Sequence, residues 1–380
     1  MRSLYVTSVQ SFSGKTAICL GLGRRMQADG FKVGYFKPLG TELRQVGTRL
    51  YHDEDTLFAS QVLNLSEPPQ VLAPVCLTPD LIKEQLAGST QDLMTLIIEA
   101  YNIARQDKDV LVLEGGATLR EGYAVGLATG KVARMLGVPV MAVIKYDSDL
   151  HIVDDALSAQ AWLGDQLIGV VINHVPPTRL AFACEVAAPA LERRRVSVFG
   201  VLRQEEHLVA TTVGEIVHAA EGQILCRRDK RDELVENLRV GAMSVEETRT
   251  RLMDNLPLNV VSADEARTRL GRVPNKAVIT ASDYTEMISV ALETGAKLIL
   301  LTGKQEPDQN LLQRAVNLGI PVAMIPHDTL RAIDRIERLF GKSGLTQSAS
   351  LTRLEALMER YFDFKRFYER MGLTPGQPVP

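Results

Sequence analysis

The chain has 380 residues, enough for two domains of ordinary size and a short additional segment. Hydrophobic residues make up 46% and charged residues 23%, a balance typical of a folded globular protein that excludes global disorder and fibrous classes. The 43 Lys and Arg residues nearly match the 46 Asp and Glu residues, and the formal charge of −3 gives no electrostatic reason to expect nucleic acid as a partner.

The cysteines and the apolar segments indicate the compartment. Cys19, Cys76, Cys184 and Cys226 are widely separated and form no CxxC pair, so the sequence suggests neither a zinc site nor a disulfide framework. No apolar stretch approaches the roughly 20 residues that a bilayer requires, and residues 1–8 are typical of a strand rather than of a leader peptide. We therefore expect a cytoplasmic protein without membrane contact.

Short apolar runs alternate with helix-period segments through the first part of the chain. A run that is apolar at every position is typical of a strand covered on both faces, and the intervening helices would supply the covers. We therefore predict a doubly wound parallel α/β sheet over residues 1–222. Its expected strands are Leu4–Ser8, Val33–Phe36, Val110–Glu114, Val138–Ile144, Leu167–Asn173 and Val196–Val201.

The segment between the first strand and the first helix reads SFSGKT over residues 11–16. Polyphosphate binding needs backbone N–H groups at a helix N-terminus, a flexible cation and a hydroxyl for Mg²⁺, which this segment offers as a P-loop would. The residues predicted to bind phosphate are Ser11, Ser13, Gly14, Lys15 and Thr16. The usual P-loop has a glycine five residues before Gly14, where this chain has Val9. A loop that only caps the helix therefore remains the alternative.

Acidic residues follow at positions suited to a metal. Glu114 ends an apolar strand, so its carboxylate is expected at the carboxyl edge of the sheet, where ligands of doubly wound folds bind and where it could hold Mg²⁺. The alternative for Glu114 is a helix-capping acid. Asp53, Glu54 and Asp55 precede a helical segment. One of them is a candidate metal ligand, although N-capping would explain Asp53 or Asp55 equally well.

Two further polar residues end strands. Lys37 follows the second strand, at the edge expected for Gly14, where a second ammonium group could hold a γ-phosphate or the group that attacks it. Asn173 ends the fifth strand, and its carboxamide could read a purine edge with one donor and one acceptor. The alternatives are an ordinary surface lysine and a turn-forming asparagine before Pro176 and Pro177.

In order and spacing these motifs resemble dethiobiotin synthetase, a P-loop family of ATP-dependent carboxylase and cyclo-ligase activity. The resemblance covers residues 1–215 and places Ser8 at the opening glycine of that family's loop, which accounts for the unusual spacing. It implies ATP and Mg²⁺ as cofactors. The roles that it implies are phosphate and Mg²⁺ binding for Lys15 and Thr16, the γ-phosphate for Lys37, the metal for Asp55 and Glu114, and adenine for Asn173.

This chain departs from that family at several positions. Gln10 stands where the family has an acidic residue, Arg203 replaces a proline near the last strand, and residues 39–44 do not look like its serine-containing substrate loop. We expect nucleotide binding to survive these changes and recognition of diaminopelargonate to be lost.

A second, smaller α/β domain is predicted over residues 223–340. The charged stretch at 226–232, near the start of this range, favours a linker over an anion-binding patch. Its expected strands are Leu238–Gly241, Leu258–Val261, Ala277–Thr280, Lys297–Leu301 and Pro321–Ile325. Residues 279–285, with the segments around Gly303 and Gly319, resemble a DRTGG domain. Asp283 and Thr285 keep the first and third positions of its name-giving motif, and helix capping is the alternative role of Asp283.

The last segment, residues 341–380, is predicted to contain one amphipathic helix over Ser350–Met371. Five aromatic residues fall within Tyr361–Tyr368. Such a cluster should be buried against the chain's own domains or a second copy, and alternating charges argue against a membrane. From this helix and the family resemblance we expect a homo-oligomer, with a further protein partner conceivable through the same helix.

A dethiobiotin-synthetase-like domain followed by a DRTGG domain resembles the amino-terminal regulatory half of long phosphate acetyltransferases. The residues after the second domain are too few for an acyl-transfer domain, so acetyl transfer is not expected. One hypothesis is an ATP- and Mg²⁺-responsive regulatory or scaffold protein. A second is an ATP-dependent carboxylase or amide ligase with Lys15 and Lys37 as catalytic residues. A third is a structural module with a vestigial loop.

Overall fold

The computed structural model describes residues 1–46, 50–89, 91–205, 211–242, 263–303, 307–329, 331–333, 335–336 and 348–376. The chain divides into two compact units. The first unit comprises residues 1–205 and 351–380, and the second comprises residues 206–350.

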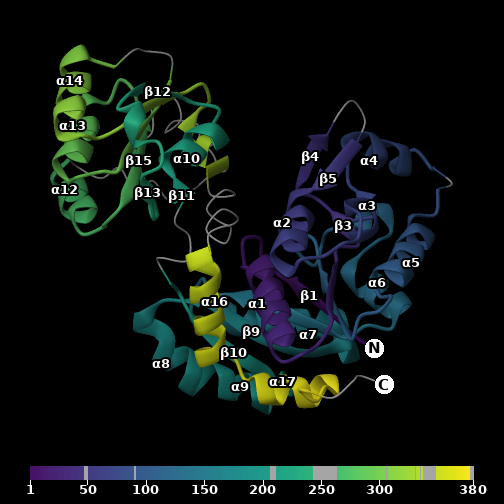
Figure 1. The fold of residues 1–380 in the computed structure, drawn as a ribbon. Coiled ribbons are helices and arrows are strands. Elements are labelled where there is room, and N and C mark those ends of the chain that lie inside the picture. Colours follow the sequence, from purple (N-terminus) through teal and green to yellow (C-terminus); the bar gives the residue numbers. More distant parts are fainter. Residues whose placement is uncertain are drawn as a thin grey trace. The chain divides into compact units, whose positions relative to one another are not determined.

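The first unit is built on a six-stranded sheet with the order β10-β9-β8-β1-β7-β2, in which every neighbouring pair is parallel (Figure 1). Its strands are β1 (Arg2–Ser8), β2 (Val33–Phe36), β7 (Val110–Glu114), β8 (Val140–Lys145), β9 (Leu167–Val175) and β10 (Val198–Arg203). Each predicted strand is present, with its ends within two residues of the prediction. The predicted doubly wound parallel fold is confirmed.

Helices cover both faces of this sheet. One face packs against a core supplied by α5 (Leu93–Ala104), α6 (Thr129–Leu136), α7 (His151–Leu163) and α9 (Ala188–Arg193). On the other face lies α1 (Lys15–Ala28), which contacts β1 and β7. Successive residues of each strand point to opposite faces of the sheet, and helices bury both faces. The apolar runs within the strands are therefore continuous rather than alternating.

Smaller elements surround the carboxyl edge of the sheet and its flanks. The hairpin of β4 (Leu43–Val46) and β5 (Leu50–Asp53) leads into α2 (Glu54–Leu63). The others are β3 (Leu39–Gly40), α3 (Pro69–Leu72), β6 (Val75–Cys76), α4 (Pro79–Leu86), the 3-10 helix η1 (Tyr123–Val125) and α8 (Leu180–Phe182). These elements place Asp53 and Asp55 near the first helix, because α2 packs on α1 and β2.

The carboxy-terminal segment returns to the first unit and forms two helices, α16 (Ser348–Tyr361) and α17 (Phe364–Met371), where the periodicity predicted one (Figure 1). The break occurs where Phe362 pairs with Gly200 and the Asp363 amide donates to the Phe199 carbonyl at 2.6 Å. Asp363 then caps α17. The backbone at the break is thus used to extend the edge of the sheet, which a periodicity argument does not detect.

The aromatic cluster of this segment is buried on the chain itself. The Phe367 and Phe362 rings lie 5.5 and 6.2 Å from the Phe199 ring on β10, and Met358 packs against Gly21 on α1. Burial was predicted, and the structure shows that the first unit supplies the covering surface. The aromatic residues therefore give no reason by themselves to expect a second copy or another protein at this helix.

The second unit contains a five-stranded sheet with the order β12-β17-β16-β15-β14. Its strands are β12 (Gln223–Cys226), β14 (Asn237–Ala242), β15 (Lys276–Ala281), β16 (Leu298–Thr302) and β17 (Val322–Ile325), all parallel except β12. Its helices include α10 (Val213–Ala219), α12 (Ala263–Gly271), α13 (Thr285–Glu293) and α14 (Gln309–Leu318), and β11 (Thr211–Thr212) pairs with β13 (Leu234–Val235). The predicted strand Leu258–Val261 lies outside the described residues.

The structure divides the chain at a different place from the predicted boundary at residue 222. Helix α10 buries Val213, Ile216 and Val217 in the core of the second unit, and β12 pairs with β17 of the same sheet. The charged stretch at 226–232 likewise lies inside the second unit as the end of β12 and a 3-10 turn, rather than as a linker. Its arginines and lysines lie on a short turn and are at least partly exposed to solvent, and for this reason the stretch resembles a linker in sequence.

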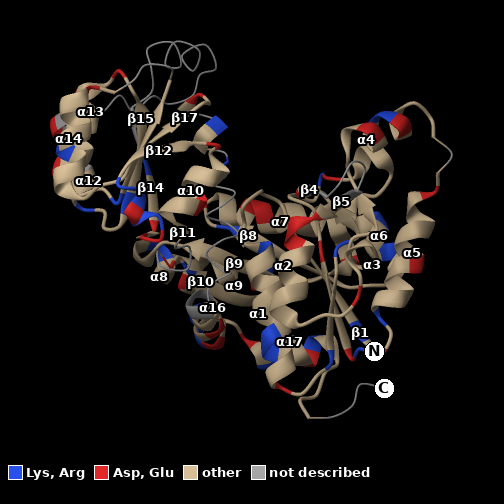
Figure 2. Ribbon diagram, turned by 45° about the horizontal axis from the view of Figure 1, so that its top comes forward, with Lys and Arg blue, Asp and Glu red and all other residues tan. Residues whose placement is uncertain are grey.

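Positive and negative side chains are interspersed over the helices of each unit (Figure 2), in keeping with the nearly balanced composition. Among the helices that the structure describes, none combines the length and the apolar character needed to traverse a bilayer.

Candidate functional site

The loop between β1 and α1 forms a tight bend that contains two residues with positive φ. Gly14 lies directly before the helix in the left-handed region, with φ of 85°. A Cβ atom there would lie 2.5 Å from the Asn173 side-chain nitrogen, so the position requires glycine for space as well as for conformation. Phe12 also has a positive φ, of 53°, and its side chain is 52% exposed.

Lys15, the first residue of α1, lies at the centre of this loop. Its Nζ donates to the Ala117 carbonyl at 2.8 Å and to Ser8 Oγ at 3.1 Å, and the side chain is only 8% exposed. Burial lowers the pKa of the Lys15 ammonium, and the nearby Glu114 carboxylate partly opposes this shift. Within the described residues no carboxylate lies within ion-pair distance of this Nζ. The ammonium is therefore held by neutral oxygens that a phosphate could replace.

Thr16 and Glu114 come together beside Lys15. Thr16 Oγ1 donates to one carboxylate oxygen of Glu114 at 2.7 Å, and the Tyr35 hydroxyl donates to the other at 2.8 Å. Glu114 is 2% exposed, and burial raises the pKa of its carboxyl group while Lys37 and the Thr16 hydroxyl lower it. The carboxylate ends β7 at the carboxyl edge of the sheet, as predicted.

These two residues fit a magnesium ion that is held jointly with a bound phosphate. Mg²⁺ usually keeps several waters and takes one or two protein ligands together with phosphate oxygens. In the part of the chain that the structure describes, no cluster of three or more His, Cys, Asp or Glu residues suits a metal held by protein alone. The Thr16 hydroxyl and the Glu114 carboxylate are oxygen ligands of the kind that Mg²⁺ prefers.

Lys37 and Asp55, predicted to face the γ-phosphate and the metal respectively, form an ion pair with each other. Lys37 Nζ lies 2.5 Å from Asp55 Oδ2 and 3.2 Å from Asp53 Oδ1, with Lys37 only 1% exposed. Burial alone would lower the pKa of Lys37, but the carboxylates of Asp55 and Asp53 outweigh it and raise the pKa. Asp53 also caps α2 by accepting from the Thr56 amide, so the capping alternative holds for this residue.

Asn173 lies at the end of β9 and contacts the loop itself. Its Nδ2 donates to the Ser13 carbonyl at 2.9 Å, and the residue is 8% exposed. This donor fastens the loop to the sheet, which leaves the carboxamide oxygen and the second N–H of Nδ2 for the predicted purine contact. Its neighbour His174 has a positive φ of 59°, and burial lowers the pKa of this imidazole to about 4.

The two serines predicted to bind phosphate differ in environment. Ser13 is fully buried, and its hydroxyl has no hydrogen-bond partner within the described part of the chain, whereas Ser11 is half-buried. A buried hydroxyl without a partner is costly, which is a reason to expect a ligand atom at this position. Lys15, Thr16, Ser13 and Gly14 therefore surround one bend, with Glu114 beside it.

Sequence reasoning gave no role to several groups that complete the site. Tyr35 binds Glu114, the Ala117 carbonyl and Ser8 hold Lys15, and the Glu121 carboxylate accepts from the Ala117 amide. The sequence signal for this segment was Gly115-Gly116, which indicates close packing after β7. A Cβ on Gly116 would overlap the Glu121 carboxylate. A backbone carbonyl leaves no mark in the sequence.

In the second unit, Asp283 of the DRTGG-like motif does not cap the helix that follows it. Helix α13 begins after Tyr284 with no side-chain cap, and Asp283 is exposed. The capping role considered for Asp283 is therefore wrong. The carboxyl edge here carries hydroxyl groups: Thr302 Oγ1 and Thr329 Oγ1 lie 2.8 Å apart.

Comparisons with known proteins agree with this architecture. The profile of the AAA domain family matches residues 2–212, and that of the DRTGG domain matches residues 215–339. Phosphate acetyltransferase of Nitrosomonas europaea is 23% identical, with 89% of this chain and 48% of the relative covered. The enzyme of the same name from Nitratidesulfovibrio vulgaris is 23% identical, with 97% and 51% covered. The chain thus spans about half the length of the curated relatives that it matches.

Among solved structures, the CBS and DRTGG domains of the regulatory region of Clostridium perfringens pyrophosphatase, complexed with the activator diadenosine tetraphosphate, match at 13% identity. This match covers 44% of the present chain and 73% of the other, with a TM-score of 0.25, too low to carry an argument. The predicted combination of a P-loop domain with a DRTGG domain, as in phosphate acetyltransferases, is confirmed by the two profiles and the curated relatives. Because the first profile matches more than half of the chain, the protein belongs to this AAA domain family and carries a DRTGG domain after it.

Proposed function

We propose that the first unit binds ATP together with Mg²⁺ and that the chain is a nucleotide-responsive regulatory module related to phosphate acetyltransferases. The observation that carries this proposal is the placement of Lys15. Among the residues that the structure describes, its buried ammonium is held only by the Ala117 carbonyl and the Ser8 hydroxyl, at the N-terminus of α1. A triphosphate would meet the ammonium, the helix N-terminus and the backbone amides of the bend at once.

The metal ligands proposed are Thr16 and Glu114. Thr16 Oγ1 and a Glu114 carboxylate oxygen lie 2.7 Å apart, so the two side chains would hold a Mg²⁺ ion together with phosphate oxygens. When bound, the ion would supply charge neutralisation for the phosphates. Lys15 and the amides of residues 13–16 would hold and orient the phosphate oxygens, and Asn173 would keep the loop fixed through the Ser13 carbonyl.

The pairing of Lys37 favours regulation over a ligase reaction. In a ligase, this ammonium would have to stabilise charge on a transferring phosphoryl group. Here it is engaged by both Asp53 and Asp55, so its charge is already balanced. We therefore assign Lys37 and Asp55 a supporting position beside the nucleotide. The relatives are named for acetyl transfer to phosphate. In this proposal the 380 residues of the present chain do not catalyse that reaction by themselves.

The test is isothermal titration of the full chain with ATP in the presence and absence of Mg²⁺, with ADP and AMP as comparators. We expect saturable binding of ATP that strengthens with Mg²⁺. In Thr16→Val and Glu114→Gln the strengthening by Mg²⁺ should disappear while metal-free binding of ATP persists. No binding heat with ATP under either condition would overturn the proposal.

A second measurement addresses the reaction. The full chain, assayed for acetyl exchange between acetyl-CoA and phosphate, should show no rate above that of buffer, with and without ATP. A rate that rises with protein concentration would contradict the regulatory assignment.

A further inference from the structure

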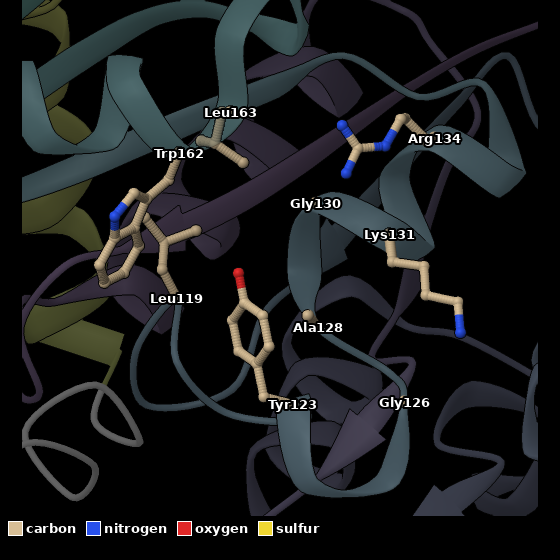
Figure 3. A pocket seen from close by; sticks show the side chains of 9 residues that line it. All are labelled: Leu119, Tyr123, Gly126, Ala128, Gly130, Lys131, Arg134, Trp162 and Leu163. Carbon is tan, nitrogen blue, oxygen red and sulfur yellow. The ribbon is translucent and has the colours of Figure 1, made fainter.

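A pocket lies on the first unit, formed by residues that the nucleotide site does not use. It is lined by the segment after β7, by α6 and by the end of α7, and its volume is about 160 Å³ (Figure 3). The lining residues are Leu119, Tyr123, Gly126, Ala128, Gly130, Lys131, Arg134, Trp162 and Leu163. This volume resembles that of an engineered cavity of about 150 Å³ that holds benzene, so it suits one six-membered ring.

The walls combine flat apolar surface with positive charge. Figure 3 shows the Tyr123 hydroxyl pointing inward between Trp162 and Gly130, with the Arg134 guanidinium on the α6 side. Tyr123 is 66% exposed and Trp162 is 46% exposed, an uncommon condition for large aromatic side chains of one unit. Within the described residues neither Arg134 nor Lys131 has an ion-pair partner.

This lining defines a class of ligand. An unpaired guanidinium recognises a carboxylate or a phosphate group through two parallel hydrogen bonds. Aromatic walls favour a flat apolar body, and the phenol and the indole N–H can bind its polar edge. We propose that this pocket binds a small organic anion that carries one flat ring and one carboxylate or phosphate group.

The pocket is joined to the phosphate loop through its own wall. The Leu119 side chain lines the pocket, and its backbone amide donates to the Ser8 carbonyl at 2.7 Å. Two residues earlier, the Ala117 carbonyl accepts from Lys15 and from the Ser8 hydroxyl. Through these contacts we expect occupancy of the pocket to change ATP affinity, and ATP then changes the affinity of the pocket by the same factor. This coupling rests on the proposed function, whereas binding to the pocket does not.

Trp162 is the single tryptophan of the chain, so its fluorescence reports on the pocket directly. The full chain is titrated with benzoate and with phenyl phosphate, and in parallel with neutral benzamide and with inorganic phosphate. We expect saturable changes with the two ring anions, and the stronger of them identifies the preferred anionic group. Benzamide and inorganic phosphate should bind about tenfold more weakly or not at all. If benzamide binds as tightly as benzoate, the ligand need not be an anion. If inorganic phosphate binds as tightly as phenyl phosphate, the ligand needs no ring. Either result would overturn the proposed ligand class.

Variants assign the effect to the pocket. Arg134→Gln should weaken binding of the ring anions by about tenfold. The control Arg105→Gln removes an exposed arginine outside the lining and should leave binding unchanged. Arg134 is also exposed, so both variants are expected to fold, which thermal melting checks. Unchanged binding in Arg134→Gln, or the absence of any fluorescence change in the full chain, would overturn the site.

The coupling is measured by titrating ATP at zero and at saturating concentration of the ring anion. We expect the ATP dissociation constant to change by about fivefold or more, and the change to vanish in Arg134→Gln. A change of less than about twofold would refute the coupling. In Lys15→Met the nucleotide site is impaired, yet the Trp162 titration should remain, so a failure of the proposed function is distinguished from a failure of the pocket.

Discussion

Two buried lysines, one in each unit, are nearly alike in their contacts and opposite in their placement. Lys15 is 8% exposed and Lys276 is 2% exposed, and burial lowers the pKa of both. Each ammonium donates to neutral oxygens: Lys15 Nζ to one carbonyl and one hydroxyl, and Lys276 Nζ to the Thr294 carbonyl at 2.5 Å and the Val273 carbonyl at 3.2 Å.

The difference lies in the helix ends that they face. Thr294 is the C-terminal cap of α13, so Lys276 places a cation where the helix dipole is negative. Lys15 is the first residue of α1, where the dipole is positive and a cation is unfavourable unless an anion joins it. The burial of Lys276 therefore stabilises its own fold, whereas we propose that Lys15 is held in place for an anionic ligand.

The largest effect on stability is expected at Lys37, a third buried lysine, which shares the region of Lys15 but is fully paired. Lys37→Met would leave Asp53 and Asp55 buried without their cation and should cost about 3–5 kcal/mol in the free energy of unfolding. Denaturant titration measures this loss, with exposed Lys32→Met as the control. Partial recovery in the double variant Lys37→Met with Asp55→Asn is expected. A loss below about 1 kcal/mol would show that the ion pairs of Lys37 with Asp53 and Asp55 do not stabilise the fold substantially.

His174 provides a pH test of the same region, since it lies next to Gly14 and its pKa is about 4 when folded against 6.5 ordinarily. The unfolded chain binds more protons than the folded chain between these values, so stability should fall as the pH is lowered from 6.5 to 4. The loss should be about 3 kcal/mol at most. His174→Gln should flatten this part of the profile, as measured by denaturant titration at several pH values. An identical slope in the variant would remove His174 as the cause.

A smaller effect is expected at Lys276. Lys276→Met leaves the Thr294 and Val273 carbonyls without their donor and should cost about 1–3 kcal/mol in the stability of the second unit. Lys297→Met, which removes a half-buried surface ion pair with Glu233, should cost about 1 kcal/mol or less. ATP affinity should be unchanged in both variants. Weakened ATP binding in Lys276→Met, with stability intact, would reverse the comparison.

Much of the fold followed from local pattern. The strands of the first sheet are short runs of apolar residues, and their positions needed no knowledge of distant contacts. In the second sheet β12 was not predicted, because its residues are half exposed and do not form such a run. The site residues that follow strand ends, Lys15, Thr16 and Glu114, could be found because parallel strands bring their carboxyl ends to one edge. The position of these residues at the carboxyl edge of the sheet could therefore be predicted from the sequence.

The parts that could not be predicted depend on contacts between distant segments. Lys37 turned out to be paired because the hairpin and α2 bring Asp53 and Asp55 to it, which spacing alone does not show. The helix break at Asp363 depends on a carbonyl of β10, and the assignment of α10 to the second unit depends on the core it joins. Backbone acceptors such as the Ala117 carbonyl carry no side-chain signal at all.

The placement of Lys15 is tested most directly by the dissociation constant of ATP with Mg²⁺ for the wild-type chain, Lys15→Met and Lys276→Met, measured by isothermal titration. We predict affinity about 100-fold weaker in Lys15→Met, because a charge-assisted contact to phosphate is lost, and wild-type affinity in Lys276→Met. Wild-type affinity in Lys15→Met would contradict the assignment of this buried ammonium to a phosphate.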